Sequence, residues 1–211
     1  INKRFDIASK LTEVLFIERC LNLLKKGGRL GIVLPDGVLN GANLQKCRDF
    51  VEGKAKILMI TSIPQDVFVA AGATVKPSLL FFKKFTEEEE QLYNQIKDEA
   101  TKEVNTKFAT QEENAQQLPT KEKKTKLKEI AEQISTEIKS LIKERFNYEI
   151  PIANVQKAGI DTLGNECENQ LIEVLQEFKK YQSNHKMWNT PNKKIYKYSF
   201  DATKITREEI A

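Results

Sequence analysis

Residues 13–35, EVLFIERCLNLLKKGGRLGIVLP, contain the pattern that decides the fold of this chain. Apolar side chains recur at steps of three and four residues in the first half, as on one face of a helix. Thr12 is a candidate N-cap, and the double glycine at 27–28 provides a left-handed residue that ends the helix. The apolar run Leu30–Leu34 does not alternate with polar residues, which is typical of a strand covered on both faces of a parallel sheet. The stretch therefore predicts an α/β fold.

The residues that follow extend this pattern into a small sheet. A second amphipathic helix is predicted over residues 43–51, and a second buried strand over residues 57–63. Strand, crossover helix and strand form a βαβ unit. A third strand, residues 78–82, comes only about a dozen residues later, a connection that favours an antiparallel hairpin over another crossover. We therefore expect a βαβ unit that closes with an antiparallel last strand.

Composition divides the 211 residues into three stretches. Residues 1–85 hold nearly all the long apolar runs and carry 14 basic and 7 acidic side chains. Residues 86–147 are mostly charged, with 11 basic and 14 acidic side chains, and residues 148–211 are mixed, with 9 of each. We expect domain boundaries at these two points. Because the chain begins at Ile1 and its first clear element is a mid-domain helix, we also expect it to be the back half of a larger protein.

Several classes of protein are disfavoured by the sequence. The three cysteines stand far apart without metal-ligand spacing and are predicted to be reduced, as in a cytoplasmic protein. His185, the single histidine, has no acidic or cysteine neighbours, so we assign it no metal or triad role. The chain has no apolar run of membrane-spanning length and no export signal. We expect no metal and no membrane.

Two longer runs carry a family resemblance. Residues 15–41, LFIERCLNLLKKGGRLGIVLPDGVLNG, and residues 60–84, ITSIPQDVFVAAGATVKPSLLFFKK, resemble the second half of the catalytic domain of adenine-N6 DNA methyltransferases. The resemblance is to the modification subunit of type I restriction-modification systems in particular. Residues 157–171, KAGIDTLGNECENQL, are similar to a segment beyond that domain. The LPDGVL turn and the DVF loop ending in SLLFFKK make the resemblance specific.

The resemblance implies the closing half of a Rossmann-like methyltransferase sheet and a reaction in which S-adenosylmethionine methylates a flipped adenine. In the family, a Gly-rich loop holds the cofactor and an Asn-Pro-Pro-aromatic loop holds the amine. Neither motif is in this chain, because Asn189, Thr190 and Pro191 are followed by Asn192 instead of a second proline and an aromatic residue. We therefore expect no catalytic residue here, an S-adenosylmethionine loop outside the chain, and an isolated chain without activity. The implied partners are double-stranded DNA and the specificity and restriction subunits.

Five residues are candidates for the target site. By resemblance, Phe68 stacks on the flipped adenine; the alternative is a side chain that fills the core beneath the strand hairpin. Pro35, Asp36 and Gly37 end a central strand, where open α/β sheets bind ligands, so we expect them at the pocket or at the edge of the cofactor cleft. Their alternative is a turn in which Asp36 caps a local amide. Lys76 is a weak candidate for a DNA phosphate, because a single loop lysine is usually only solvated.

A charged helical hairpin is predicted over residues 86–147. Thr86 and Glu89 form a capping box at the start of a helix that runs to about Phe108. A polar stretch then precedes a second helix with heptad spacing at Leu127, Ala131, Ile134, Ile138 and Leu141. The hairpin is either a protruding coiled coil that meets DNA or another subunit, or a solvated insertion. Beyond it we expect a helix from Leu171 to Phe178 and an alternating strand at residues 196–200.

Two classes of function therefore stay open. The first is a portion of an adenine-N6 DNA methyltransferase of a restriction-modification system. The second is a non-catalytic assembly or DNA-binding module that keeps the sheet as scaffold and acts through the helical hairpin. The two classes predict different surroundings for Phe68. The methyltransferase class places it at a cleft, and the assembly-module class places it inside the core.

Overall fold

A computed structural model of the chain describes residues 5–7, 9–187, 196–200 and 205–209. Its internal contacts separate two compact units, Ile1–Gln170 and Leu171–Ala211. The two units are therefore described one after the other. The three-part division at residues 85 and 147 stays a prediction.

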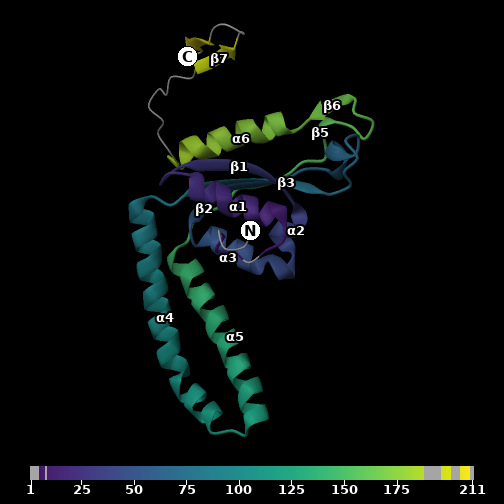
Figure 1. The fold of residues 1–211 in the computed structure, drawn as a ribbon. Coiled ribbons are helices and arrows are strands. Elements are labelled where there is room, and N and C mark those ends of the chain that lie inside the picture. Colours follow the sequence, from purple (N-terminus) through teal and green to yellow (C-terminus); the bar gives the residue numbers. More distant parts are fainter. Residues whose placement is uncertain (1–4, 8, 188–195, 201–204, 210–211) are drawn as a thin grey trace. The chain divides into compact units, whose positions relative to one another are not determined.

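The first unit is built on a four-stranded sheet (Figure 1). Its strands are β1 (Arg29–Pro35), β2 (Ala55–Ser62), β3 (Pro77–Lys84) and β4 (Ile152–Asn154). The order across the sheet is β1-β3-β2-β4, with β3 antiparallel to both neighbours and β4 parallel to β2. The predicted antiparallel strand is confirmed, and it lies between the two parallel strands of the βαβ unit. The short β4 extends the sheet beyond β2, which the sequence did not predict.

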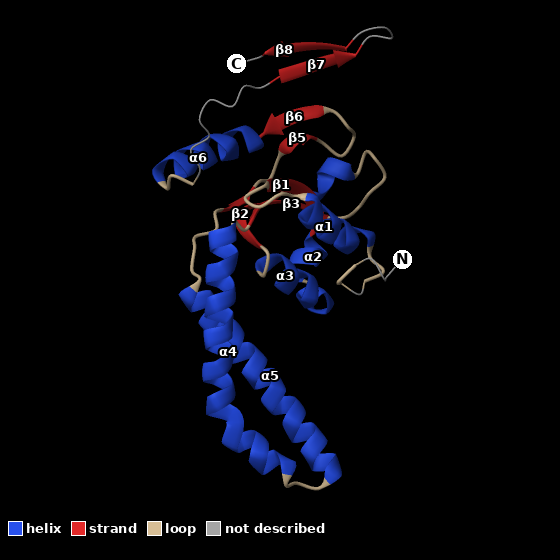
Figure 2. Cartoon of the chain, turned by 60° about the vertical axis from the view of Figure 1, so that its left-hand side comes forward, coloured by secondary structure: helices blue, strands red, loops and turns tan. Residues whose placement is uncertain are grey.

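Helices cover one face of this sheet (Figure 2). They are α1 (Thr12–Leu23), α2 (Asp36–Asn40), the 3-10 turn η2 (Ala42–Leu44) and α3 (Gln45–Glu52). Their apolar sides and the sheet form one buried cluster: Val14, Ile17, Leu21, Leu34, Val38, Cys47, Val51, Ala55, Leu80 and Phe82. The predicted apolar stripe of the first helix is thus confirmed as the centre of the core.

The ends of α1 differ from the prediction. Thr12 is the first helical residue rather than the N-cap, and the N-cap position makes no side-chain hydrogen bond. The helix ends at Leu23, and the backbone of the following residue, Leu24, is extended. Gly27 has a left-handed φ of 70°, but it serves the turn into β1, where its N–H donates to the Lys84 carbonyl at 3.1 Å. The Lys84 ammonium donates to two carbonyls of the last turn of α1, each at 2.8 Å, and so satisfies the end of the helix.

The prediction that β1 is covered on both faces is wrong for the described residues. Leu30, Ile32 and Leu34 face the core, whereas Val33 on the other face is exposed. Phe81, opposite Gly31 in the register, is exposed on that face too. Within the described part of the chain, β1 pairs only with β3, so one of its edges has no partner strand.

The predicted helical hairpin is confirmed as α4 (Glu87–Gln116) and α5 (Thr120–Arg145). The first helix runs well past Phe108, so the polar stretch that we expected as a linker is mostly helical. The two helices share a small core made by Val104, Phe108, Ala115 and Ile130, with Leu127, Ile134, Ile138 and Leu141 packed against it. Ala131, which the heptad reading placed in the stripe, is exposed, and Ile130 is buried instead.

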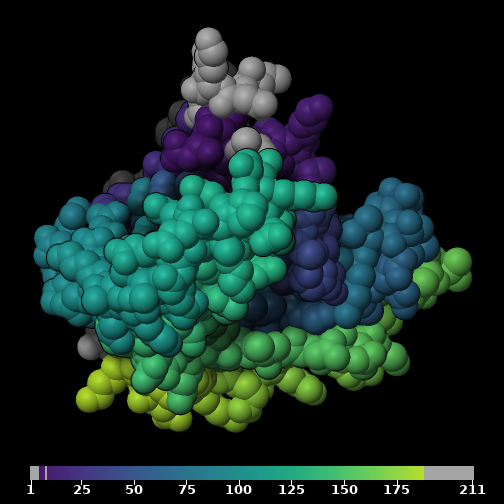
Figure 3. All heavy atoms as spheres, turned by 90° about the horizontal axis from the view of Figure 1, so that it is seen from below, coloured from purple at the N-terminus to yellow at the C-terminus, as the bar shows by residue number. Residues whose placement is uncertain are grey.

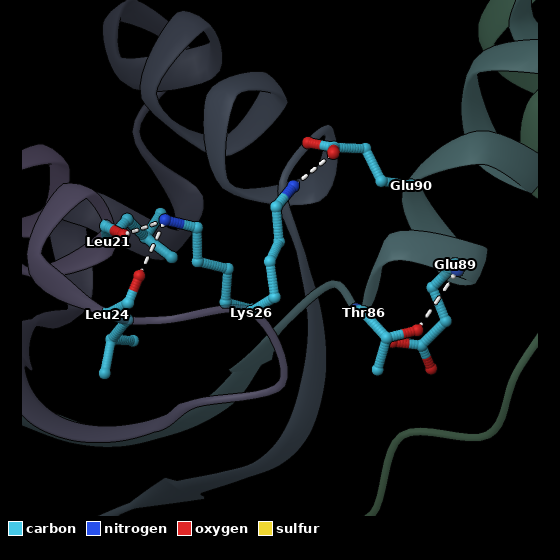
Figure 4. Close-up of polar contacts among 7 residues, drawn as sticks. Leu21, Leu24, Lys26, Thr86, Glu89 and Glu90 are labelled. Atoms are coloured by element: carbon cyan, nitrogen blue, oxygen red, sulfur yellow. Dashed lines mark hydrogen bonds and ion pairs between the residues drawn. The ribbon is translucent and has the colours of Figure 1, made fainter.

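The start of α4 is tied to the sheet. The predicted capping box is present, since Thr86 accepts from the Glu89 N–H and the Glu89 carboxylate accepts from the Thr86 N–H (Figure 4). The same carboxylate accepts from Lys83 on β3 at 2.8 Å. Figure 4 also shows the ion pair between Lys26 and Glu90, which joins the loop before β1 to α4. The hairpin therefore starts from a fixed point on the sheet.

A small antiparallel pair, β5 (Ala158–Ile160) and β6 (Glu166–Asn169), ends the first unit. The second unit contains the predicted helix, α6 (Leu171–Asn184), and the predicted strand, β7 (Tyr196–Phe200), which pairs with β8 (Ile205–Glu209). Residues 189–192, compared above with the amine-holding loop, lie outside the described residues. No helix in the described ranges has the length and apolar content needed to cross a membrane.

Candidate functional site

The topology brings two loops to one edge of the sheet. Strands β1 and β2 both end at this edge, and β3 starts there because it runs antiparallel to them. Pro35 at the end of β1 lies opposite Pro77 at the start of β3. The chain after β1 and residues 63–76 between β2 and β3 therefore meet at the carboxyl edge of the two parallel strands. This is the place where open α/β sheets bind ligands.

Asp36 connects both loops at this edge. Its N–H donates to the Lys76 carbonyl at 3.0 Å, its carboxylate accepts from the Ser78 hydroxyl, and the Lys76 ammonium lies 3.5 Å from a carboxylate oxygen. Two candidates that the sequence treats separately, Asp36 and Lys76, thus form one ion pair. The Lys76 side chain is half exposed and has three donors, so it can contact a further anion.

The alternative, in which the Asp36 side chain caps a local amide of the turn, does not match the contacts of its carboxylate. Asp36 is the first residue of the short helix α2, and its carboxylate is engaged by the start of β3. Gly37 follows in the same helix, and a Cβ placed there would meet no atom within 4 Å. The surface above Gly37 is therefore open for close approach of another molecule.

Two serines extend the polar edge across the sheet. Ser62 at the end of β2 lies opposite Ser78 in the register, and directly opposed residues of an antiparallel pair share a face. The Ser62 hydroxyl is buried and has no hydrogen-bond partner among the described residues. Sequence reasoning missed both serines. Their position in the sequence could have identified them, because Ser62 is the last residue of β2 and Ser78 is close to the start of β3.

Phe68 lies at the same end of the sheet, in the 3-10 turn η3 (Gln65–Phe68). Its carbonyl accepts from the N–H groups of Ala71 and Ala73 at 3.1 and 2.9 Å, and the Gln65 amide donates to the Thr74 carbonyl. These bonds fold residues 64–76 into a closed loop. The Phe68 side chain is half buried and belongs to neither apolar cluster found among the described residues.

The β5–β6 pair borders this loop, as the blue and green atoms at one side of Figure 3 show. A Cβ at Gly164, in the turn between β5 and β6, would lie 3.4 Å from the Ala70 Cβ. In that turn, hydrogen bonds lower the pKa of the Asp161 carboxyl, and the bond from the Asn165 N–H has the largest effect. Residues from the predicted family segment thus form one border of the carboxyl edge.

A large groove lies at the opposite end of β2. Its volume is about 930 Å³, and it is lined by α3, α4, α5 and the segment from Phe146 to Ile150. Lys54, which lines it, precedes β2, whereas the Phe68 loop follows β2. An eight-residue strand spans roughly 25 Å. This groove is therefore separate from the carboxyl edge.

A half-buried tyrosine lines the groove. The Tyr148 hydroxyl accepts from the Ile57 N–H at 3.2 Å, and burial raises the pKa of this hydroxyl. Lys139 on α5 pairs with Asp49 on α3 at 2.8 Å. The groove thus marks where the hairpin rests on the sheet. Among the described residues, no group of histidine, cysteine, aspartate or glutamate side chains can hold a metal.

The mixed sheet and the helices on one of its faces place this protein in the α/β class. Comparison of the sequence with family models then gives the family: the N-6 DNA methylase model matches residues 2–160. The chain therefore belongs to the N-6 DNA methylase family. The resemblance to adenine-N6 DNA methyltransferases drawn from the sequence is confirmed at the level of this family. No curated protein matches this chain.

Two solved structures match parts of the chain. One comes from a study of complex assembly and conformational transition in a type I R-M system, with 31% identity over 38% of this chain and 17% of its own, and a TM-score of 0.35. The other, from Listeria monocytogenes, is described as a class I S-adenosylmethionine-dependent methyltransferase, with 24% identity over 40% of this chain and 27% of its own, and a TM-score of 0.35. This chain spans less than a third of either protein.

Proposed function

We propose that this chain is the second half of the catalytic domain of an adenine-N6 DNA methyltransferase, the modification subunit of a restriction-modification system. The carboxyl edge of its sheet would form one wall of the pocket for the flipped adenine. The observation that carries the proposal is the placement of Phe68, half buried in a closed loop at the carboxyl edge, where open α/β sheets bind ligands. A side chain that only filled the core would be fully buried, as Phe82 and Phe85 are.

One edge of β1 supports the proposal that the rest of the catalytic domain completes the sheet. β1 has one edge without a partner strand among the described residues, and exposed strand edges are normally covered or paired. On the adjacent helix α1, Phe16 and Leu23 are 59% and 69% exposed. They lie seven residues apart and so share one helix face. A further strand and helix from the rest of the domain would cover both surfaces.

In this proposal the chain positions the base and does not perform the chemistry alone. Phe68 would stack on the adenine, a contact that contributes roughly 1–3 kcal/mol per base. The polar row of Asp36 and Ser78 would border the pocket, and Lys76 would meet a phosphate. The residues present do not form a cofactor cradle, because the sequence has no Gly-rich loop between a strand and a helix; Gly27 and Gly28 stand before a strand. The isolated chain would therefore be inactive.

The proposed partners are double-stranded DNA and the specificity and restriction subunits of the same system, all in the cytoplasm. The hairpin of α4 and α5 supports an assembly role in addition, because the two helices have a core of their own and a groove at their base. This surface is also what the second function, a non-catalytic assembly module, would use. Loss of methylation on changes at the carboxyl edge favours the enzyme over that module.

The test is Phe68→Ala in the complete methyltransferase. We expect methylation of target DNA to fall about tenfold or more, with little change in the melting temperature, because the lost contact is with the base. Phe82→Ala is the matched control, since Phe82 is fully buried in the core and its truncation should cost about 3–5 kcal/mol of stability. If Phe68→Ala lowers stability as much as the control does, Phe68 is a core residue and the proposal fails.

A further inference from the structure

Leu163 has the greatest exposure of the large apolar side chains in the described part of the chain. It lies at the tip of the turn between β5 and β6 and is 81% exposed. A single exposed leucine on a protein surface is ordinary. This one is unusual because of the backbone that carries it and because of its neighbours.

The backbone of the turn is held tightly. The Asp161 carboxylate accepts from the N–H groups of Leu163 and Asn165 at 2.9 and 2.8 Å, and the Asp161 N–H donates to the Asn165 carbonyl at 3.0 Å. Gly164 has a left-handed φ of 87°, which glycine adopts without strain. The turn therefore presents an apolar side chain to solvent on a rigid frame. A flexible turn would let the leucine fold back onto the protein.

The turn also adjoins the loop that carries Phe68. The position of a Cβ on Gly164 is 3.4 Å from Ala70, two residues after Phe68. The views of Figures 1 and 3 both place the β5–β6 pair beside the loop that follows β2. An exposed leucine and the proposed base-stacking phenylalanine thus lie on neighbouring, rigid loops at the same end of the sheet.

We propose that Leu163 is an apolar wedge that enters the DNA base stack where the target adenine leaves it. This inference rests on the proposed function. A flipped base leaves a gap in the stack, and apolar side chains such as leucine are known to insert between base steps. Leu163 fills the gap and keeps the base from returning, while Phe68 holds the base outside. Leu163 is thus a positioning residue that makes no contact with the reacting atoms.

The experiment uses the complete methyltransferase with its partner subunits and two DNA duplexes. In one the target adenine is paired with thymine, and in the other it stands opposite an abasic site, which weakens its hold in the stack. For Leu163→Ala we expect methylation of the paired duplex to fall roughly tenfold and methylation of the abasic duplex to stay near wild type, because flipping is cheapest for an unpaired base. Leu163→Met should retain activity on both duplexes, and the melting temperature should not change.

Two further variants separate the wedge from other roles. Asp161→Ala frees the turn and should lower methylation of the paired duplex without affecting the abasic one. Leu118→Ala, in the turn between α4 and α5, changes an exposed leucine far from this edge in the fold and should have no effect on either duplex.

Equal loss on both duplexes would show that Leu163 serves a protein contact or the fold, and would overturn the wedge. No loss on either duplex would overturn it as well. If the wild-type enzyme methylates neither duplex, while binding both, the proposed function itself fails. That outcome is distinct from failure of the wedge alone, in which the wild type is active.

Discussion

The carboxyl edge of the sheet and the helical hairpin differ in how their polar groups are satisfied. In the hairpin, charged side chains pair with each other across the helices, as Lys107 does with Glu137 and Arg145 with Glu103. At the carboxyl edge, Lys76 and Asp36 also form an ion pair, but the Ser62 hydroxyl is buried without a partner among the described residues. Buried polar groups are normally satisfied, so this exception needs an explanation, such as an ordered water, an ion or a catalytic role. The proposed binding role of the edge supplies one.

The largest effect on stability is expected for a substitution in the core of the hairpin. Ile130→Ala removes the side chain at the centre of the small core between α4 and α5, where Ile130 is almost fully buried. We expect the free energy of unfolding to fall by about 3 kcal/mol, as for other buried isoleucines replaced by alanine. Urea unfolding followed by circular dichroism measures it. Methylation of target DNA below the melting temperature should stay near wild type; a strong loss would place the hairpin in the reaction.

A smaller effect on stability is expected at the edge. Ser78→Ala removes the hydroxyl that donates to the Asp36 carboxylate, and a hydrogen bond to a charged group contributes about 1.5–3 kcal/mol. Because Asp36 keeps its ion pair with Lys76, we expect the lower end of that range. Methylation should fall more than the loss of stability explains, and assays on saturating DNA at low temperature separate the two. Unchanged methylation would mean that this polar row is only structural.

The junction of sheet and hairpin should respond to pH. Burial alone would raise the pKa of the Glu89 carboxyl, but hydrogen bonds from Lys83, the Thr86 N–H and Lys56 outweigh it, and the pKa is lowered. A lowered pKa in the folded state stabilises the protein above the ordinary value of 4.5, and this contribution is lost as the pH falls through the folded pKa.

Glu89→Gln tests this contribution while leaving a side chain that can still complete the capping box. We expect the variant to melt below wild type at pH 7, by an amount that corresponds to less than about 1 kcal/mol because the pair is partly exposed. The difference should shrink as the pH falls below 4.5 and disappear below the lowered pKa of Glu89. A difference that is the same at both pH values would show that charge plays no part.

The smallest effect is expected at Gly37. Alanine there meets no atom and lies in a helix, so Gly37→Ala should raise stability by roughly 0.5–1 kcal/mol. A larger side chain, as in Gly37→Leu, should fold equally well but lower methylation if DNA or substrate approaches the open surface above Gly37. Full activity of Gly37→Leu would remove Gly37 from the pocket.

Local patterns predicted the elements that depend on neighbours in sequence. The stripe of α1, the strand β3 and the capping box at Thr86 were each visible in a few consecutive residues. Predictions failed where contacts with residues distant in the sequence determine the structure. Lys84, some sixty residues away, satisfies the end of α1, and Ile130 rather than Ala131 faces α4 because the hairpin sets the rotation of the two helices.

The candidate site followed the same division. The resemblance pointed to Phe68, and the end of the strand that is now β1 pointed to residues 35–37. Neither showed that Asp36 and Lys76 pair or that Ser62 lies opposite Ser78. The first two residues are 40 positions apart and the second two are 16 positions apart. The exposed Leu163 was within a recognised segment, yet its place beside the Phe68 loop depends on how the β5–β6 pair packs.

The sequence by itself determined the fold class, the family and the order of the longer helices and strands, because periodicity, glycines and short motifs act over a few residues. Only the tertiary structure decided that β3 separates β1 from β2 and that the polar groups of three strands gather at one edge. Strand pairing is non-local, and its register depends on packing that no local pattern records.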